Sequence, residues 1–411
     1  MIIIHIMSNV PRLVGSALAE RLRVMPAVVV TGARQTGKST LVRQVDAGAR
    51  AYLTLDDLDV LDQATRAPDD LAGRARRVTI DEVQRRPELL RAVKRAIDRQ
   101  RTRGRFLLTG SANLLLMRQV SESLAGRASY LTLWPMTRRE QRGLGRAGIW
   151  EELLAARDED WLDIVKGDAT GEDDWRALAR RGGYPTPAVH MTADDERRTW
   201  FAGYVRTYLE RDLQEISAVT ALPDLRRLMR AACHRLGQMV NQTELGRDVA
   251  LPQPTVHRYL NLLETSYQLV RVPAYAVNRT KRLIKTPKLY WADTGLALHI
   301  AEDDTPSGAH LENLVLTDLL AWRDARSRPA EVLYWRATTG EEVDFVLEAK
   351  EGLVGIEVKS TPRPRLEDAR HLRTFRDEYP KRARTALLLH TGDRTERLAP
   401  GILSAPWWKV L

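Results

Sequence analysis

Five short apolar segments between residues 27 and 135 alternate with longer amphipathic stretches. The segments have the length of single strands, whereas the stretches between them repeat apolar residues with helical spacing. Buried strands that alternate with helices are typical of a parallel sheet covered by helices on both faces. The predicted strands are Val28–Val30, Ala51–Leu55, Val78–Ile80, Phe106–Leu108 and Tyr130–Leu133. The sequence therefore predicts an α/β domain over residues 1–136.

The rest of the chain divides into three further predicted parts. Residues 137–235 form a helical lid or linker region, with an acidic insertion from Glu151 to Asp174 that we expect to be solvated. Residues 236–300 show the pattern of a winged helix. Turn residues around Thr305–Gly308 indicate a linker. Residues 308–411 predict a helix, three strands, a helix and a strand, which make one small α/β domain.

A complete phosphate-binding loop follows the first predicted strand. Residues 32–39 read GARQTGKS, which fits the P-loop pattern at every fixed position. Glycines let backbone amides turn toward phosphates, and the following helix adds positive charge at its N-terminus. Lys38 is expected to reach the β- and γ-phosphates of ATP, and Ser39 to bind Mg²⁺. The predicted nucleotide-binding residues are Gly32, Gln35, Thr36, Gly37, Lys38, Ser39 and Thr40.

Two carboxylates, Asp81 and Glu82, end the third predicted strand. Asp81 would hold Mg²⁺, and Glu82 would act as the general base on the attacking water. A helix N-cap is the alternative role for such a pair, but the phosphate-binding loop upstream favours catalysis. Thr109 ends the next strand, where it would either sense the γ-phosphate or cap the following helix.

Seven short motifs occur in order along the chain. They are Gly32–Gln35, Asp81–Gln84, Thr109–Ser111, Ser123–Arg127, Gly182–Pro185, Tyr208–Asp212 and Asp293–Leu296. Together they resemble a large prokaryotic family of AAA-type ATPases whose C-terminal half is a domain of unknown function, number 4143. The resemblance covers nearly the whole chain and implies a P-loop fold of the additional-strand class that binds ATP. Arg127 would stabilise charge at the γ-phosphate, in cis or from a neighbouring subunit, or would be purely structural.

The segment from Thr243 to Glu264 predicts a helix-turn-helix. Thr243 can cap the first helix, and Pro254 suits the first turn of the second. The apolar residues that fall on one buried face are Leu245, Val249, Val256, Leu260 and Leu263. The exposed face of the second helix would offer Gln253, Thr255, His257 and Arg258 to DNA.

The segment from Arg271 to Lys288 holds six basic residues and no acidic residue. We interpret it as a β-hairpin wing beside the helix-turn-helix, a common arrangement for holding DNA phosphates. The predicted phosphate contacts are Arg279, Lys281, Arg282 and Lys285. The alternative is a winged helix that only packs domains together.

A second set of charged residues lies in the C-terminal part. Asp344 belongs to one predicted strand, and Glu357 and Lys359 share one face of the next. With Glu312 on the preceding helix, this order resembles the PD-(D/E)XK nuclease fold. The resemblance implies that Glu312, Asp344 and Glu357 bind Mg²⁺ and that Lys359 positions or activates a water molecule. A fold of this kind that has lost its activity is the alternative.

Composition limits the possible functions. There are 64 basic and 54 acidic residues, and the resulting net charge of +10 suits a polyanionic partner such as DNA, although it can also serve solubility. The single cysteine, Cys233, excludes an internal disulfide and a cysteine-rich zinc site. No apolar run approaches the ~18 residues of a membrane span, so we expect a cytoplasmic protein.

Two hypotheses follow. The first is a DNA-associated ATPase that uses ATP and Mg²⁺ and carries a nuclease-like C-terminal domain. The second is a nucleotide-dependent signalling or scaffold switch whose nuclease-like domain is inert. Salt-dependent DNA binding would favour the first, and ATP-dependent self-association without DNA affinity would favour the second.

Overall fold

The computed structural model describes residues 10–110, 124–209 and 221–411. Five parallel strands form the sheet of the N-terminal lobe: β1 (Ala27–Thr31), β2 (Ala51–Thr54), β3 (Val78–Asp81), β4 (Phe106–Thr109) and β5 (Ala128–Thr132). Their order across the sheet is β2-β3-β4-β1-β5. Strand β4 therefore lies between the strand that leads into the phosphate-binding loop and the strand that ends in Asp81. This arrangement confirms the predicted α/β fold of the additional-strand class.

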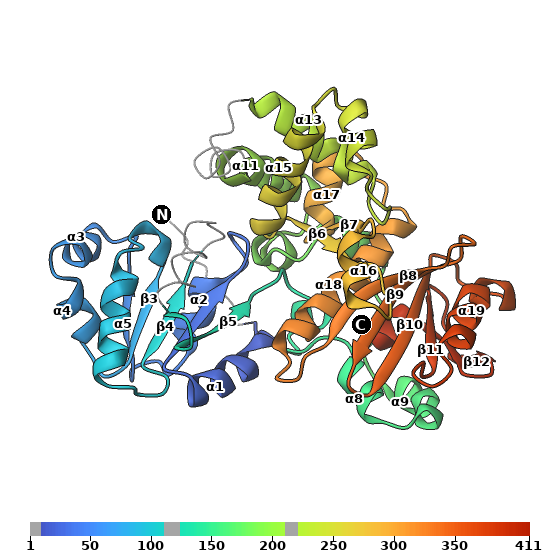
Figure 1. Ribbon diagram of the computed structural model, residues 1–411, viewed down its shortest axis with the longest axis horizontal. Helices are drawn as coiled ribbons and strands as arrows, with labels where there is room; N and C mark the ends of the chain where they lie inside the picture. Colours follow the sequence, from blue (N-terminus) through green and yellow to red (C-terminus); the bar gives the residue numbers. More distant parts are fainter. Residues whose placement is uncertain (1–9, 111–123, 210–220) are drawn as a thin grey trace.

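Helices cover both faces of this sheet (Figure 1). They are α1 (Val14–Val24), α2 (Lys38–Gln44), α3 (Leu58–Arg66), α4 (Pro68–Gly73) and α5 (Leu89–Arg99). Alternate residues of β1 serve the two faces, as the strand repeat requires. Val29 packs in the core that includes α3, α4 and α5, whereas Val28 and Val30 pack in the core that includes α1 and α2.

The acidic segment after the sheet is folded and packed, so the expectation of a solvated insertion is wrong. The helices of this region are α7 (Arg138–Gln141), α8 (Trp150–Ala155), α9 (Trp161–Gly167) and α10 (Trp175–Arg181). The side chains of Trp150 and Trp161 are each only 1% exposed. Arg384 of the C-terminal part pairs with Asp158 at 2.6 Å, and α8 and α9 lie beside that part in Figure 1. Asp158 therefore joins this segment to the C-terminal part, while the buried tryptophans pack the segment in place.

The predicted helix pair of the middle part is confirmed. The helices here are α11 (Asp194–Tyr204), α13 (Leu222–His234), α14 (Gln242–Asp248) and α15 (Gln253–Thr265). All five apolar residues predicted for the shared face are buried. Asn241 caps α14 in place of Thr243, because its side chain accepts hydrogen bonds from the amides of Thr243 and Glu244.

The basic segment differs from a simple hairpin wing. Strands β6 (Leu269–Val272) and β7 (Lys288–Trp291) pair in antiparallel fashion, but helix α16 (Arg279–Ile284) lies between them. The side chain of Asn278 caps α16, and Arg282 anchors it by two ion pairs to Glu331 and Glu348. We call the antiparallel pair β6–β7 the ribbon.

The C-terminal part begins after α17 (Thr294–Ala301). Its elements are α18 (Gly308–Ala325), β8 (Glu331–Arg336), β9 (Glu342–Ala349), β10 (Gly352–Lys359), α19 (Arg370–Glu378), β11 (Ala386–His390), β12 (Glu396–Ala399), β13 (Ile402–Pro406) and α20 (Trp407–Val410). The strand order is β12-β13-β11-β10-β9-β8. The predicted succession of helix, three strands, helix and strand is present, and β12, β13 and α20 extend it.

One continuous apolar core joins the middle and C-terminal parts. It includes Trp291 of the ribbon, Leu319 of α18 and Leu387 of β11. The two parts therefore pack as one body, whereas most of the N-terminal sheet packs in two cores of its own and forms a separate lobe in Figure 1. None of the helices described combines the length and apolar character needed to span a membrane.

Candidate functional site

The phosphate-binding loop connects β1 to α2 at the carboxyl end of the N-terminal sheet. Gly32 and Gly37 have φ angles of +139° and +93°, which residues with a side chain rarely adopt. A Cβ atom on Gly32 would lie 2.4 Å from the carbonyl oxygen of Leu133, so only glycine fits there. Thr36 is buried and its hydroxyl donates to the Ala33 carbonyl oxygen at 2.9 Å, whereas Gln35 is exposed with a φ of 63°. The loop therefore has the geometry that its sequence predicted.

Lys38 lies across this loop. Its ammonium donates to the carbonyl oxygens of Gly32 at 3.2 Å and Ala33 at 2.7 Å, and its side chain is buried. Burial lowers the pKa of Lys38 to about 8, and the nearby charges of Glu82 and Asp81 oppose that decrease. The ammonium is thus held at the loop that would surround the phosphates, next to both carboxylates.

Asp81 ends β3 and is held by three hydroxyl groups. Its Oδ1 accepts hydrogen bonds from Ser39 at 3.1 Å and from Thr109, and its Oδ2 accepts one from Tyr52 at 2.6 Å. Burial, followed by the hydrogen bond to Asp81, raises the pKa of Tyr52 to about 12, so its hydroxyl stays a donor at neutral pH. These donors are neutral, so they orient the carboxylate without cancelling its charge.

Glu82 follows Asp81 in a left-handed backbone conformation, with a φ of 58°. A residue with a side chain adopts this conformation only when its surroundings impose it. Here the Glu82 amide donates to the Thr109 hydroxyl at 3.1 Å, and the side-chain amide of Gln84 donates to the Glu82 carboxylate. Thr109 thus joins the carboxylate of Asp81, the predicted metal ligand, to the backbone amide of Glu82, the predicted general base. Its alternative role as a helix cap concerns residues 111–123, which lie outside the described part of the chain.

Arg127 lies at the opposite end of the sheet from the loop. It directly precedes β5, whose first residue pairs with Ala27 at the start of β1. Since β1 is five residues long, roughly 16 Å of strand separates that end from the loop. The guanidinium pairs instead with Asp98 at 2.6 Å. The prediction that Arg127 contacts the γ-phosphate in cis is therefore wrong. Contact from a neighbouring subunit stays a prediction. Ser111, Ser123 and Glu210–Asp212, which the resemblance included, lie outside the described residues.

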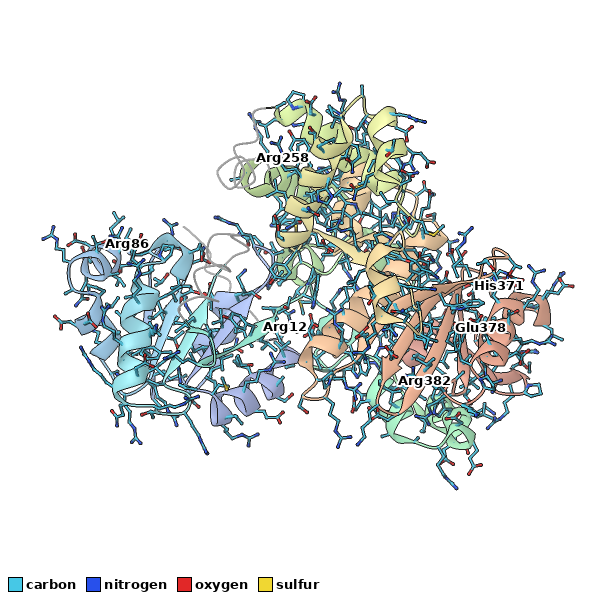
Figure 2. The ribbon with its side chains drawn as sticks, in the orientation of Figure 1. Arg12, Arg86, Arg258, His371, Glu378 and Arg382 are labelled. Carbon is cyan, nitrogen blue, oxygen red and sulfur yellow. The ribbon has the colours of Figure 1, made fainter. Side chains whose placement is uncertain are left out.

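Residues far away in the sequence also hold the loop. Figure 2 labels Arg12 between the N-terminal lobe and the rest of the chain. Its guanidinium donates to the carbonyl oxygens of Thr36 and Trp134, both at 2.7 Å. It also pairs with Glu140 at 3.0 Å. No motif indicated Arg12, because its partners lie 24 to 128 positions away.

Tyrosines of the middle part reach the same region. The Tyr267 hydroxyl shares a hydrogen bond of 3.0 Å with the Thr31 hydroxyl at the end of β1, and the Tyr204 hydroxyl donates to the Arg34 carbonyl oxygen at 3.4 Å. Tyr204 also joins a buried network with Tyr184 and Gln268. The phosphate-binding loop is therefore contacted by Tyr204 of α11, and Thr31 directly before the loop is contacted by Tyr267, two residues before the ribbon.

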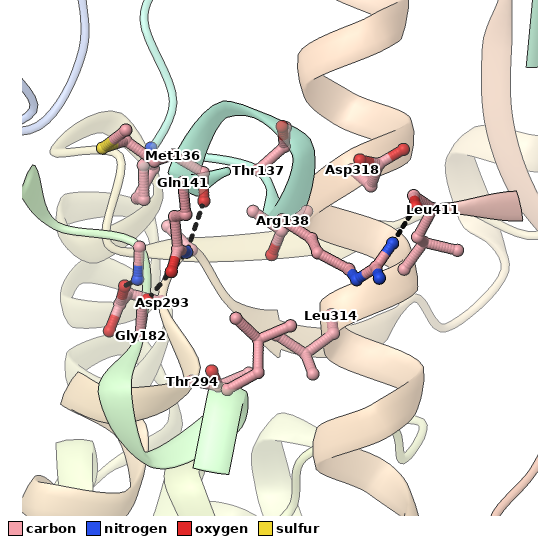
Figure 3. A pocket seen from close by; sticks show the side chains of 15 residues that line it. Met136, Thr137, Arg138, Gln141, Gly182, Asp293, Thr294, Leu314, Asp318 and Leu411 are labelled. Carbon is pink, nitrogen blue, oxygen red and sulfur yellow. Dashed lines mark hydrogen bonds between the residues drawn. The ribbon is translucent and has the colours of Figure 1, made fainter. Parts of the chain in front are cut away.

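Two of the family motifs hold the fold together. Asp293 accepts hydrogen bonds from the amides of Gly183 at 2.6 Å and Leu296 at 2.8 Å, and burial raises its pKa to about 6. Gly182 and Asp293 also line a cavity of about 20 Å³, which Figure 3 shows and which has room for about one water molecule. The motifs at residues 182–185 and 293–296 therefore pack against each other and have a structural role.

The predicted residues of the C-terminal part lie together. Asp344 on β9 accepts a hydrogen bond from the Val358 amide of β10 at 2.9 Å, and the Lys359 ammonium pairs with Glu357 Oε1 at 2.6 Å. Glu357 is 3% exposed, and its second oxygen has no hydrogen-bond partner. Burial, followed by the charge of Asp344, raises the pKa of Glu357 well above its usual range. Glu312 on α18 is close enough for burial and Asp344 to raise its pKa to about 7.

Lys288, which the sequence assigned only to the basic wing, lies among these carboxylates. Its Nζ atom is 3.1 Å from Glu312, 3.2 Å from Asp344 and 2.7 Å from Glu342. Burial alone would lower the pKa of Lys288, but the three carboxylates outweigh it and raise that pKa above the usual value. In the described part of the chain, no three His, Cys, Asp or Glu residues are placed to hold a metal ion. The predicted set of three metal-binding carboxylates is therefore not assembled in this conformation.

The predicted DNA-contacting residues are mostly exposed. The exposed ones are Gln253, His257, Arg258, Arg279, Lys281 and Lys285, and Thr255 is half-buried. Figure 2 labels Arg258 on α15. Arg282 is only 6% exposed and pairs with Glu331 at 2.8 Å and Glu348 at 2.6 Å. The prediction of Arg282 as a phosphate contact is therefore wrong, because its charge is already neutralised inside the protein.

Three family models match the chain in succession. An AAA domain matches residues 25–141, the domain of unknown function DUF8612 matches residues 172–307, and the domain of unknown function DUF4143 matches residues 307–409. Among solved structures, a Walker-type ATPase of Pyrococcus abyssi is 16% identical, with a TM-score of 0.44, over 70% of this chain and 94% of that one. The DNA clamp loader delta protein of Bacillus subtilis is 13% identical, with a TM-score of 0.23, over 75% of this chain and 99% of that one.

Curated relatives align over most of the chain. Uncharacterised proteins of Mycobacterium tuberculosis and Mycobacterium bovis are each 32% identical over 359 residues, which are 84% of this chain and 73% of theirs. An uncharacterised protein of Haemophilus influenzae is 22% identical over 67% of this chain and 64% of its own. The chain therefore belongs to the same family as the mycobacterial proteins, and it is an AAA-type protein with a C-terminal DUF4143 domain.

Proposed function

We propose that this protein hydrolyses ATP to ADP and phosphate, with Mg²⁺, at the carboxyl end of the N-terminal sheet. The observation that supports this most is the pairing of Ser39 Oγ with Asp81 Oδ1 at 3.1 Å, beside Glu82 and the phosphate-binding loop. Two oxygen ligands at adjacent octahedral positions, each about 2.1 Å from Mg²⁺, lie about 3 Å apart. The donor set therefore fits Mg²⁺ in chemistry and in spacing.

Each residue has a distinct role in this proposal. Lys38 and the loop amides bind the β- and γ-phosphates, and the Glu82 carboxylate accepts a proton from the attacking water. Thr109 fixes Glu82 relative to Asp81 by its two hydrogen bonds. When bound, Mg²⁺ supplies positive charge that offsets the charge of the phosphates.

Phosphate release from ATP by the full chain tests this function. We expect turnover that requires Mg²⁺ and stops when the metal is removed with EDTA. A protein that binds an ATP analogue with Mg²⁺ but releases no phosphate would contradict the proposed hydrolysis and would favour a nucleotide-dependent switch.

A second candidate function is phosphodiester cleavage at the C-terminal carboxylates. It is favoured by the unpartnered buried oxygen of Glu357 beside Asp344, with Lys359 two positions further along the same strand. Two carboxylates and an ammonium can bind a divalent ion and orient a water molecule for attack on a phosphodiester. Cleavage of DNA in Mn²⁺ that is lost in Asp344→Asn, with ATP hydrolysis unchanged, would support this function. Absence of cleavage by the wild-type protein would favour the inert domain.

Association with DNA is part of the same proposal. Four exposed basic residues lie on or next to two helices: Arg258 on α15, Arg279 and Lys281 on α16, and Lys285 directly after α16. Exposed cations on helices can bind the phosphates of a duplex without reading its sequence. Measurement of DNA affinity as a function of salt concentration tests this contact.

A further inference from the structure

The carboxylates of the C-terminal site already contact a positively charged side chain of the protein, the ammonium of Lys288. Lys288 is 2% exposed, and its ammonium makes three contacts of 2.7 to 3.2 Å with Glu312, Glu342 and Asp344. Withdrawing an ammonium from water is costly, and the three carboxylates compensate Lys288 for the lost hydration. The three contacts are therefore a specific arrangement rather than an incidental surface pair.

The contacted oxygens are those that a metal ion would need. Lys288 bridges Glu312 Oε1 and Asp344 Oδ1, and both residues are predicted metal ligands. A divalent ion bound to the same two oxygens would lie within a few ångströms of the ammonium, where two positive charges repel strongly in a buried site. Lys288 and the metal ion therefore compete for one position.

The neighbouring carboxylate indicates that the site accepts a further ligand. Glu357 Oε2 is buried and has no hydrogen-bond partner, although a buried carboxylate oxygen is normally satisfied. Its other oxygen is taken by Lys359. This unpartnered oxygen stands apart from the contacts of Lys288 and leaves Glu357 able to accept a further partner, such as a cation.

We propose that Lys288 is an internal occupant of the C-terminal cation site, so that a divalent ion binds Asp344 and its neighbours only when Lys288 withdraws. This inference rests on the proposed carboxylate site and adds its regulation. The site is closed in the conformation described here, and it opens when the Lys288 ammonium leaves its three carboxylates.

The ribbon connects Lys288 to a residue beside the phosphate-binding loop. Lys288 pairs with Val272 at one end of the ribbon, and Leu269 pairs with Trp291 at the other. Tyr267, two residues before Leu269, shares its hydrogen bond with Thr31, which directly precedes the loop.

The test is Mn²⁺ binding by the full chain without nucleotide, measured by titration calorimetry. Lys288→Met keeps the length of the side chain and removes its charge. We expect it to tighten Mn²⁺ binding at least tenfold relative to wild type, and we expect Lys288→Arg to stay as weak as wild type. Adding Asp344→Asn to Lys288→Met should remove the gain, which assigns it to this site rather than to Asp81.

A milder variant guards against loss of the fold. Glu342 contacts Lys288 but is not a predicted metal ligand, so Glu342→Gln weakens the hold on the lysine and should tighten Mn²⁺ binding in the same direction. If folded Lys288→Met and Glu342→Gln bind Mn²⁺ in an Asp344-dependent way but no more tightly than wild type, the role of Lys288 is overturned and the carboxylate site itself is not. No Asp344-dependent binding in any variant overturns the carboxylate site itself, and with it this inference.

Discussion

The protein holds two carboxylate sites that differ in the groups that contact their acids. At the N-terminal site, Asp81 is held by the hydroxyl groups of Ser39, Tyr52 and Thr109. At the C-terminal site, the ammonium of Lys288 contacts Glu312 and Asp344, and Glu312 also accepts a hydrogen bond from the Tyr290 hydroxyl. Both sites are buried and both include a lysine, but Lys38 donates to the carbonyl oxygens of its own loop.

This difference shows why similar residues do not imply similar readiness for a metal ion. Hydroxyl donors fix the orientation of a carboxylate and leave its charge for a cation. A buried lysine cancels that charge and takes the position of the cation. We therefore expect the nucleotide site to bind Mg²⁺ with ATP directly, whereas the C-terminal site first requires a conformational change.

Lys38→Ala gives the largest expected loss. The variant removes the ammonium that would bind the β- and γ-phosphates, so we expect ATP hydrolysis to fall by roughly 100- to 1000-fold or more. The side chain packs against its own loop, so the domain should stay folded, which circular dichroism can check. Full turnover in a folded Lys38→Ala protein would show that the loop is not the nucleotide site.

Glu82→Gln separates binding from chemistry. The amide keeps the size of the side chain but cannot accept the proton of the attacking water, so turnover should fall about 100-fold while binding of an ATP analogue is retained. Glu88→Gln is the matched control, because Glu88 is an exposed acid six positions further along that pairs with Arg86 at 3.4 Å. Equal rates for the two variants would mean that Glu82 has no catalytic role.

Asp318 offers a third kind of buried acid, with neither a hydroxyl nor a lysine partner. It accepts hydrogen bonds from Trp150 Nε1 at 2.6 Å and the Gly148 amide at 2.8 Å, and burial raises its pKa to about 6. The folded protein therefore keeps this proton at pH values where the unfolded chain has lost it. Its contribution to stability is present below pH about 4 and is lost as the pH rises to about 6.

Asp318→Asn should remove that dependence. Relative to wild type, the variant should gain up to about 3 kcal/mol of stability between pH 4 and pH 7, on the basis of about 1.4 kcal/mol per pKa unit. Thermal unfolding of both proteins across this pH range measures the difference. If the stabilities of the wild type and Asp318→Asn change with pH by the same amount, Asp318 does not change its protonation on unfolding.

The smallest expected effect concerns the exposed cations near the ribbon. Replacing Arg279, Lys281 and Lys285 with Gln should flatten the dependence of DNA affinity on salt by about two to three phosphate contacts. Arg282 is excluded from this set because its charge pairs inside the protein. Lys350→Gln, at an exposed turn of the C-terminal sheet, is the control. An unchanged slope in the triple variant would place any DNA contact elsewhere.

Local patterns in the sequence placed the residues of the predicted nucleotide site correctly in the fold. The loop residues are contiguous, and Asp81 and Glu82 stand at the end of a strand, so one segment of chain sets their geometry. Thr109 ends the next strand, as expected, and its hydroxyl lies beside Asp81. Arg127 was misplaced because a short motif does not show which end of the sheet it occupies.

Long-range pairing explains the other differences. The acidic segment was expected in solvent because its charge was counted without its tryptophans, which pack against the C-terminal part. Lys288 was assigned to a DNA-binding wing because its partners, Glu312 and Asp344, lie 24 and 56 positions away. Arg282 was misassigned for the same reason, since Glu331 and Glu348 belong to a different part of the chain.

A crystal structure of the full chain with Mn²⁺ and a non-hydrolysable ATP analogue tests the difference between the two sites most directly. Anomalous scattering locates the metal without reference to activity. We predict a Mn²⁺ peak beside Ser39 and Asp81, and no peak at Asp344 wherever Lys288 keeps its contacts. A peak bridging Glu312 and Asp344 with Lys288 still in place would contradict the competition between lysine and metal.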